Sequence, residues 1–278
     1  MRLQHHQPLK TLGPQAARLV TELYERGRRI FTLAEIAAIT GLGSASTRSF
    51  ARKLVNRGVA ARLGAGLFTL VPFELGRDRE YMGNPYVVAR EIMRGKPYYV
   101  SHASAMDVHR MLTQPQFIVN VTSPISVRGR TVLNTEFRFV RCKPSHFFGT
   151  VEHWVDKQDK VIVSDIERTL IDGLRQPEYC GGFTEVAKGF WMRRTDVDVK
   201  KLVKFAFRLG VGAVIRRLGY LLETFGIEAP KEIERLRASL TPTYLLVDPL
   251  LPAEGKFLAR WRLRLNVTPE EIQAVVRT

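Results

Sequence analysis

The segment from Ser44 to Gly66 carries basic and small side chains and no acidic residue. Arg48 and Arg52 are four residues apart, so a helix would place both on one face. Guanidinium groups bind phosphates and the edges of guanine bases, and small neighbouring side chains let a helix backbone approach closely. An ordinary solvated helix face mixes charges of both signs. The pattern therefore predicts a surface for a polyanion.

Three helices are expected to position these side chains. The first is predicted over residues 14–27, because a proline opens it and a glycine ends it. The second begins at Thr32, where Glu35 three residues later completes a capping-box pattern. The third runs over residues 44–57. Its apolar side is expected to face the core and consists of Phe50, Ala51, Leu54 and Val55.

A hairpin is expected after the third helix. Residues 59–63 and 67–71 have the composition of short strands, and a glycine-bracketed turn joins them, with Arg62 near the turn. Three helices followed by such a wing make a winged helix-turn-helix, whose third helix enters the major groove of double-stranded DNA. The residues expected to contact DNA are Ser46, Arg48, Ser49, Arg52, Lys53, Arg57 and Arg62. Two other interpretations stay open, a solvated basic face and a protein-docking module.

The whole chain is strongly basic. Its 43 Lys and Arg against 27 Asp and Glu give a net charge of +16, which favours nucleic acid over an anionic membrane as partner. Its 278 residues predict two domains, 1–80 and 81–278, with a polar linker at 72–84. Cys142 and Cys180 have no CxxC spacing, so we expect no disulfide framework or zinc site and a cytoplasmic location. No apolar run reaches membrane-spanning length, so no membrane partner is expected.

The second domain mixes predicted strands and helices, so the expected fold class is α+β: an N-terminal winged helix-turn-helix followed by a larger mixed domain. Helices are expected at 85–93, after a cap at Ser101, and repeatedly over 183–239. Residues 159–174 run from a strand directly into a helix. Further strands are expected at 116–122, 131–141, 147–155 and 257–267.

The string "SDIERTLID" places Asp165, Arg168 and Asp172 on one helical face, a spacing that suits a metal ion or a phosphate. Ser164 and Glu167 also match a capping box, so helix initiation explains most of the pattern. Arg168 is expected to pair with one of the two aspartates. A metal-dependent nuclease is the weaker alternative, because no Walker loop, nucleophile elbow or dinucleotide fingerprint indicates an enzyme.

Basic residues recur on later predicted helices: Lys201, Lys204, Arg208, Arg216 and Arg217. Such faces are usually solvated, and an acidic or nucleic-acid partner is the other interpretation. His102 and His109 are seven residues apart and lack further ligands at a suitable spacing. We therefore expect no metal and no cofactor.

Three strings of the sequence together resemble the AbiEi-type antitoxins of type IV toxin-antitoxin (abortive infection) systems. They are "YYVSHASAMDVHRML", "SDIERTLIDGLRQPEYCGGFTEVAKGF" and "IRRLGYLLETFG". With the expected winged helix-turn-helix, the resemblance covers nearly the whole chain. The segment through the first helix departs from the shorter front ends of the family.

The resemblance implies a non-enzymatic protein of phage defence with two roles. One is repression of its own operon through inverted repeats in its promoter, with DNA contacts at the third-helix positions Ser46, Arg48, Ser49, Arg52 and Lys53. The other is to counteract a nucleotidyltransferase-like toxin, in some family members without a stable complex. The positions in the matching strings that would serve antitoxicity are Asp165, Glu167, Arg168, Arg216 and Arg217. A stand-alone winged-helix regulator with a ligand-sensing C-terminal domain is the alternative.

Overall fold

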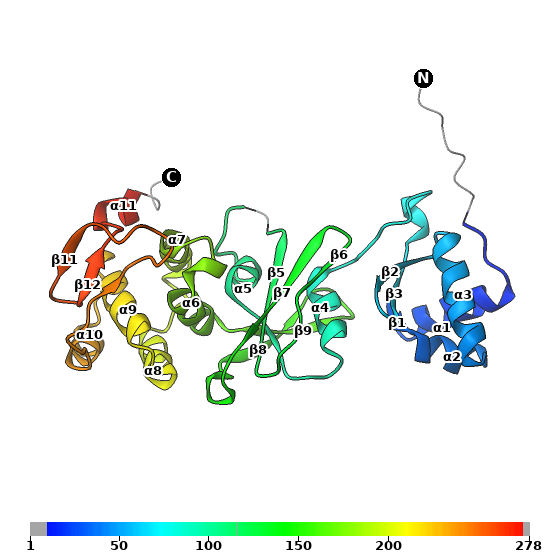
Figure 1. Cartoon of the computed structure of the whole chain (residues 1–278), viewed down its shortest axis with the longest axis horizontal. Helices are drawn as coiled ribbons and strands as arrows, with labels where there is room; N and C mark the ends of the chain where they lie inside the picture. The colour runs from blue at the N-terminus through cyan, green and yellow to red at the C-terminus, as the bar shows by residue number, and fades with distance from the viewer. Residues whose placement is uncertain (1–9, 115, 275–278) are drawn as a thin grey trace, which may run out of the picture. The chain divides into compact units, whose positions relative to one another are not determined.

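The computed structural model describes residues 10–114 and 116–274 and shows an α+β protein (Figure 1). The chain groups into two compact units. The first comprises the residues up to Gly95, together with 130–136 and 154–160. The second comprises 96–129, 137–153 and the chain from Val161 onward. The first unit thus extends past residue 80, where the sequence predicts a boundary.

The first unit opens with three helices and a small sheet. The sheet is antiparallel in the order β1-β3-β2, so the last strand of the hairpin lies in the middle. The elements are α1 (Pro14–Glu25), β1 (Ile30–Thr32), α2 (Leu33–Thr40), α3 (Ser44–Asn56), β2 (Ala60–Gly64), β3 (Leu67–Leu70), a 3-10 turn η1 (Phe73–Leu75) and α4 (Pro85–Met93). The expected helices and hairpin are confirmed, and β1 is an addition that the sequence did not predict.

Local chemistry explains where α2 begins and ends. The Thr32 hydroxyl accepts a hydrogen bond from the Glu35 amide, and the Glu35 carboxylate accepts one from the Thr32 amide at 2.8 Å. This reciprocal pair is the predicted capping box. Gly41 ends the helix with a φ of 72°, a left-handed conformation that glycine adopts without a steric penalty.

Apolar side chains from every element of this part of the first unit form its core. Leu19 and Leu23 of α1 are buried with Phe31, Ile36 and Leu54. The rings of Phe31 and Phe68 stack with centroids 5.9 Å apart. The core fixes α3 by its apolar side, which leaves the opposite face of α3 toward solvent.

A six-stranded sheet has the order β6-β7-β5-β4-β9-β8. The short central strand β4 pairs antiparallel with β5 and parallel with β9. Its strands are β4 (Tyr99–Val100), β5 (Ile118–Ser123), β6 (Arg130–Val132), β7 (Thr135–Arg141), β8 (Thr150–Trp154) and β9 (Lys160–Ser164), and α5 (His102–Val108) packs against β5.

Helices and a second small sheet complete the second unit. In Figure 1, α6, α8 and α9 lie side by side, and α10 packs on α8 and α9. The helices are α6 (Ile166–Arg175), α7 (Phe183–Arg193), α8 (Val199–Leu209), α9 (Gly212–Thr224), α10 (Pro230–Ala238) and α11 (Pro269–Ala274), with 3-10 turns η2 (Pro144–His146) and η3 (Pro177–Tyr179). The sheet runs β10-β12-β11, from β10 (Leu245–Leu246), β11 (Lys256–Leu258) and β12 (Leu263–Leu265).

Gly219 of α9 is a point of close packing in this unit. A methyl group at Gly219 would overlap the six-membered ring of Trp261, whose indole is fully buried on the helix. The indole N–H donates to the Glu223 carboxylate at 2.6 Å. The glycine in the string "RRLGYLLE" therefore makes room for a tryptophan that lies 42 residues further along the chain, between β11 and β12.

Two expected strands are hairpins. Residues 131–141 divide into β6 and β7 at Leu133 and Asn134, which both have positive φ values, of 43° and 65°. Residues 257–267 likewise divide into β11 and β12. In both cases residues with a high strand propensity continue through the turn. Strand propensity alone therefore did not indicate where the first strand ends and the second begins.

Candidate nucleic-acid interface

Helix α3 presents its polar face because its apolar face is held in the core. Ala51 and Leu54 are buried, and Phe50 and Val55 are half-buried, as the amphipathic pattern predicts. Thr47 is also buried, and its hydroxyl donates to the Leu42 carbonyl at 3.1 Å. These contacts fix the rotation of the helix about its axis.

The predicted DNA-contacting residues all lie at the surface. Each is exposed: Ser46, Arg48, Ser49, Arg52, Lys53, Arg57 and Arg62. Over residues 10–114 and 116–274, no carboxylate lies within ion-pair distance of Arg48, Arg52 or Lys53. The face thus combines positive charge with no internal counter-charge.

The hairpin after α3 holds Arg62 close to its turn. The Arg62 Nε donates to the Gly64 carbonyl at 3.2 Å, and the strand pairing shifts by one residue between these two positions. The Leu33 amide at the start of α2 donates to the Gly66 carbonyl at 3.2 Å. The turn is therefore tied to α2 as well as to the strands.

A pocket of about 260 Å³ lies between α3 and the hairpin. Arg48 and Arg52 line it from α3, and Arg62 lines it from β2. Apolar and glycine residues complete its wall: Leu33, Ala51, Val55, Gly66 and Phe68. The fold thus brings together three arginines that the sequence places up to 14 positions apart.

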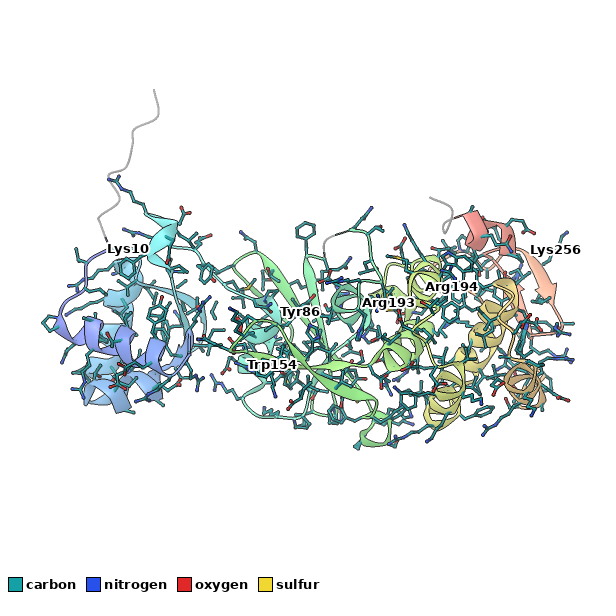
Figure 2. All side chains as sticks on the ribbon, turned by 180° about the vertical axis from the view of Figure 1, so that it is seen from behind. Lys10, Tyr86, Trp154, Arg193, Arg194 and Lys256 are labelled. Carbon is teal, nitrogen blue, oxygen red and sulfur yellow. The ribbon has the colours of Figure 1, made fainter. Side chains whose placement is uncertain are left out.

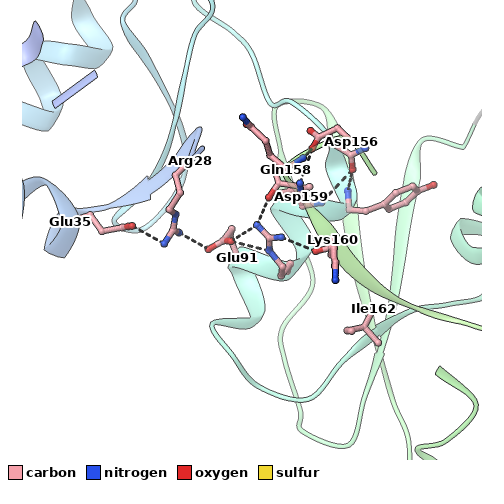
Figure 3. Close-up of polar contacts among 12 residues, drawn as sticks. Arg28, Glu35, Glu91, Asp156, Gln158, Asp159, Lys160 and Ile162 are labelled. Carbon is pink, nitrogen blue, oxygen red and sulfur yellow. Dashed lines mark hydrogen bonds and ion pairs between the residues drawn. The ribbon is translucent and has the colours of Figure 1, made fainter. Parts of the chain in front are cut away.

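Ion pairs connect the turn before β1 to α2 and to α4, and α4 to the segment 154–160, all within the first unit (Figure 3). Arg28 lies 2.9 Å from the Glu35 carboxylate and 3.5 Å from that of Glu91. Arg90 pairs with Asp159 at 2.7 Å and donates to the Lys160 carbonyl. Burial lowers the pKa of Arg90, but its hydrogen bonds to Asp159 and Glu91 outweigh this and raise it.

These ion pairs were not predicted, because sequence spacing does not reveal partners 63 or 69 positions apart. Two further contacts belong to the same unit, and Figure 2 labels one residue of each, Lys10 and Trp154. The Lys10 ammonium donates to the Pro72 carbonyl at 3.0 Å, and the Lys160 ammonium lies 4.4 Å from the centroid of the exposed Trp154 ring.

The string "SDIERTLID" forms a buried cluster in the second unit. Arg168 is fully buried, and its Nη2 donates to Asp172 Oδ1 and to the Tyr99 hydroxyl, both at 2.8 Å. The Tyr99 hydroxyl in turn donates to Asp172 Oδ2 at 3.1 Å. Burial raises the pKa of Tyr99 well above its usual value, so the hydroxyl stays protonated. The expected pairing of Arg168 with Asp172 is confirmed.

The expected capping box at Ser164 and Glu167 is wrong. Asp165 is the N-cap of α6, and its carboxylate accepts from the Arg168 amide at 2.7 Å. Ser164 is instead buried, with its hydroxyl 2.8 Å from that of Thr169. The strand β9 runs one residue further toward the helix than the pattern assumes, so the cap shifts by one position. Ser101 likewise stands at the N-cap of α5 without a capping hydrogen bond.

Glu167 and Asp165 bind α8 through Lys201. The Lys201 ammonium lies 2.7 Å from Glu167 and 3.0 Å from Asp165. Glu167 also accepts from the amide of Asp198, the N-cap of α8, at 2.9 Å. Burial lowers the pKa of Lys201, but hydrogen bonds to the two carboxylates outweigh it and raise the value.

Arg216 and Arg217 of α9 are buried and bind main-chain carbonyls. Arg216 Nη2 donates to the carbonyl and hydroxyl oxygens of Thr241, at 2.9 and 2.7 Å. Arg217 Nη1 donates to the Leu174 carbonyl at 2.7 Å, and its Nε and Nη2 donate to Leu246. Burial lowers the pKa of both guanidinium groups. Arg216 thus holds the segment before β10, and Arg217 holds the end of α6 and β10 itself.

The five residues assigned to antitoxicity from the resemblance therefore all have internal partners. Asp165 is half-buried and the other four are buried. Of the basic residues on α8, Lys200, Lys204 and Arg208 are exposed. The Arg208 guanidinium lies 4.0 Å from the centroid of the Phe148 ring. In this part of the chain the exposed cations, and not the matching strings, form the accessible basic surface.

The two histidines have main-chain and hydroxyl partners. His102 is buried with Nδ1 2.9 Å from the Ser101 hydroxyl, and burial lowers the pKa of its ring to about 4. His109 Nε2 lies 2.6 Å from the Ser164 carbonyl. Within residues 10–114 and 116–274, no three His, Cys, Asp or Glu side chains gather as metal ligands. No helix of the described chain has the length and apolarity needed to cross a membrane.

Comparisons with known proteins bear on the fold. No family model and no curated protein matches the chain. A solved structure, that of the RV2827C protein from Mycobacterium tuberculosis, is similar with a TM-score of 0.73 and covers 97% of both chains at 15% sequence identity. A mixed arrangement of helices and sheets like that of this chain thus exists in another protein over almost its full length.

Proposed function

We propose that residues 1–80 form a winged helix-turn-helix that binds double-stranded DNA, with β2 and β3 as its wing. The observation that carries the proposal is the exposed face of α3, where Arg48, Arg52 and Lys53 have no carboxylate partner in the described structure. If this face were exposed only to water, acidic residues would be expected among the basic ones, because solvated surfaces normally mix charges of both signs.

In this proposal α3 enters the major groove. Ser46 and Ser49 give the helix backbone room to approach, and Arg48 and Arg52 reach guanine edges or phosphates. Arg62, on the wall of the same pocket, contacts an adjacent phosphate or the minor groove. Lys53 and Arg57 add phosphate contacts along the helix.

The test is a titration of the full chain against a labelled duplex from upstream of its own gene, and against an unrelated duplex, at several salt concentrations. If the five basic residues of this face all meet phosphates, the logarithm of the association constant falls with that of salt at a slope of about −4 to −5. Arg48→Ala with Arg52→Ala reduces the slope by about 2. Loss of a base-reading arginine costs about 1–3 kcal/mol.

Lys256→Ala serves as the matched control. Lys256 is an exposed cation of the second unit, and its loss removes the same charge without touching α3 (Figure 2). It should leave the affinity for the upstream duplex nearly unchanged. A salt-independent affinity, or equal losses from Lys256→Ala and Arg48→Ala, would contradict the proposed interface.

We further propose that the chain is an AbiEi-type antitoxin that represses its own operon and counteracts a nucleotidyltransferase-like toxin. The three matching sequence strings support this proposal. Two of them include α6 and most of α9, whose buried arginines bind other parts of the second unit. The test is survival of cells that express such a toxin with the full chain. Rescue by a variant with Arg48→Ala and Arg52→Ala would separate antitoxicity from repression.

A further inference from the structure

The small sheet of the second unit, β10-β12-β11, has two faces of different character. One face consists of leucines that belong to the core of this unit or pack against it: Leu245, Leu258, Leu263 and Leu265. The strand register pairs Phe257 with Arg264, next to the pair of Leu258 with Leu263. Because successive side chains of a strand point to opposite faces, Phe257 and Arg264 lie on the face away from the core.

Tyr244 and Arg262 join the same face. They directly precede β10 and β12, and Arg262 Nη1 donates to the Tyr244 hydroxyl at 3.1 Å. The guanidinium carbon of Arg264 lies 5.3 Å from the centroid of the Phe257 ring. The rings of Tyr244 and Phe257 meet edge to face, with centroids 5.1 Å apart. These four residues form one cluster of two rings and two guanidinium groups, which we call the aromatic-arginine face.

The aromatic-arginine face is accessible. Phe257 is 64% exposed, and the other three residues are half-buried. The core therefore does not explain the ring of Phe257, because its partners across the sheet are the leucines of the opposite face. Aromatic residues and arginine together are enriched at binding interfaces.

The positive charge of this face is not neutralised within the described chain. Over residues 10–114 and 116–274, no carboxylate lies within ion-pair distance of Arg262 or Arg264. The neighbouring Arg260, by contrast, pairs with Glu223. Arg264 Nε donates only to the Gly255 carbonyl, at 3.5 Å. Two guanidinium groups are thus left to attract an anion.

The combination of rings and cations selects the kind of anion. Guanidinium groups bind phosphates, and exposed aromatic rings bind the flat faces of nucleic-acid bases. A duplex keeps its bases stacked inside and would offer this face only its phosphates. A single strand offers phosphates and unpaired bases together. RNA is the nucleic acid that is recognised in this form, by rings and arginines that stack on its unpaired bases.

We propose that the aromatic-arginine face binds single-stranded RNA. A base stacks on Phe257, and Arg262 and Arg264 contact the phosphates on either side of it. Tyr244 orients Arg262 through its hydroxyl and adds a second ring for the next base. The inference does not depend on DNA binding by α3, because all four residues belong to the second unit.

The experiment measures the fluorescence anisotropy of a labelled RNA of about 12 nucleotides without self-complementarity. The titrant is the full chain with Arg48→Ala and Arg52→Ala, so that these arginines of α3 do not contribute. Three probes of the same length are compared: DNA of the same sequence, the RNA annealed to its complement, and a chain of abasic sugar phosphates. The RNA should bind at least as tightly as the DNA, and about tenfold more tightly than the duplex and the abasic chain, because these two offer no unpaired bases.

Phe257→Leu keeps an apolar side chain and removes the ring, so it should weaken binding of the RNA about tenfold. Arg262→Gln with Arg264→Gln should reduce the slope of the logarithm of the association constant against that of salt by about 1.4, since each phosphate contact of a single strand contributes about 0.7. Because Phe257 is exposed, its replacement should leave the melting temperature unchanged.

Arg194→Ala is the matched control. Arg194 is another exposed arginine of the second unit, with its guanidinium carbon 3.9 Å from the centroid of the Trp191 ring, but it follows α7 and does not belong to the sheet (Figure 2). Its loss should leave binding of the RNA nearly unchanged.

Four outcomes would overturn the proposal. Equal binding of the abasic chain, or unchanged binding by Phe257→Leu, would show that bases are not recognised. Binding of the DNA about tenfold more tightly than the RNA would assign the face to single-stranded DNA. Equal losses from Arg194→Ala and from Arg262→Gln with Arg264→Gln would show that the sheet is not the binding surface.

Discussion

At the scale of single residues, Gly219 is a position where one added methyl group has a large consequence. The Trp261 ring covers it, and the bond from the indole to Glu223 prevents the ring from swinging away. We expect Gly219→Ala to destabilise the second unit by roughly 1–3 kcal/mol through overpacking. Thermal unfolding followed by tryptophan fluorescence measures this.

Gly64→Ala is the control for that substitution. Gly64 has open space where a Cβ would lie and no left-handed conformation, so the change should leave stability within a few tenths of a kcal/mol. If Gly219→Ala also leaves stability unchanged, the result would contradict the close packing of Trp261 on α9.

His102 makes the stability of the second unit depend on pH. Burial lowers the pKa of its ring from 6.5 to about 4, so between these values the unfolded chain binds a proton that the folded chain does not. The contribution of the neutral His102 ring to the free energy of unfolding is therefore fully present above about pH 6.5. It is lost as the pH falls to about 4, by roughly 3 kcal/mol in total. Denaturant unfolding at a series of pH values should show this slope.

His102→Gln should reduce that slope between pH 4 and 6.5, because glutamine does not titrate. A part of the slope remains in the variant, because burial also lowers the pKa of His109. The comparison is made between slopes, so a constant loss of stability in the variant does not affect it. An unchanged slope in His102→Gln would assign the acid sensitivity to other groups.

At the scale of elements, the helices were predictable and the breaks in strands were not. Pro14, Thr32 with Glu35, and Gly41 set helix ends by local hydrogen bonds and backbone freedom, which a sequence displays directly. The turn at Leu133 and Asn134 places two non-glycine residues at positive φ, and only tertiary pairing of β6 with β7 selects it.

The candidate interface was likewise predictable on its helix and not at its hairpin. The amphipathic pattern of α3 correctly exposes Arg48 and Arg52, because one buried face determines the other. The shared pocket with Arg62 depends on how the hairpin folds back on the helix, which no periodicity encodes. The pairing of Arg168 with Asp172 was predictable from their spacing of four residues. The contacts of Arg168 with Tyr99 and of Arg217 with Leu246 were not, because these partners are distant in the sequence.

At the scale of the whole molecule, the extent of the first unit makes a prediction about fragments. A fragment of residues 1–80 lacks α4, and with it the Glu91 partner of Arg28 and the donation from Arg94 to the Ala65 carbonyl at 3.1 Å. We expect a fragment of residues 1–95 to melt about 4–8 °C higher than 1–80, because partly exposed pairs contribute about 1 kcal/mol together. Circular dichroism measures both fragments.

Glu91→Gln in the longer fragment removes the ion pair with Arg28. It should lower the melting temperature of residues 1–95 part of the way toward that of residues 1–80. Equal melting temperatures for residues 1–80 and 1–95 would instead place the end of the folding unit at the boundary that the sequence predicts.

The position of Trp261 also sets an order of events during synthesis. The larger core draws on side chains from Met106 to Ile272, and the indole that covers α9 leaves the ribosome 42 residues after Gly219. Helices α1 to α3 and the hairpin, by contrast, are complete at Leu70, long before either residue is made. A nascent chain that has not yet reached Trp261 therefore carries α1 to α3 and the hairpin together with an α9 whose apolar surface lacks its cover.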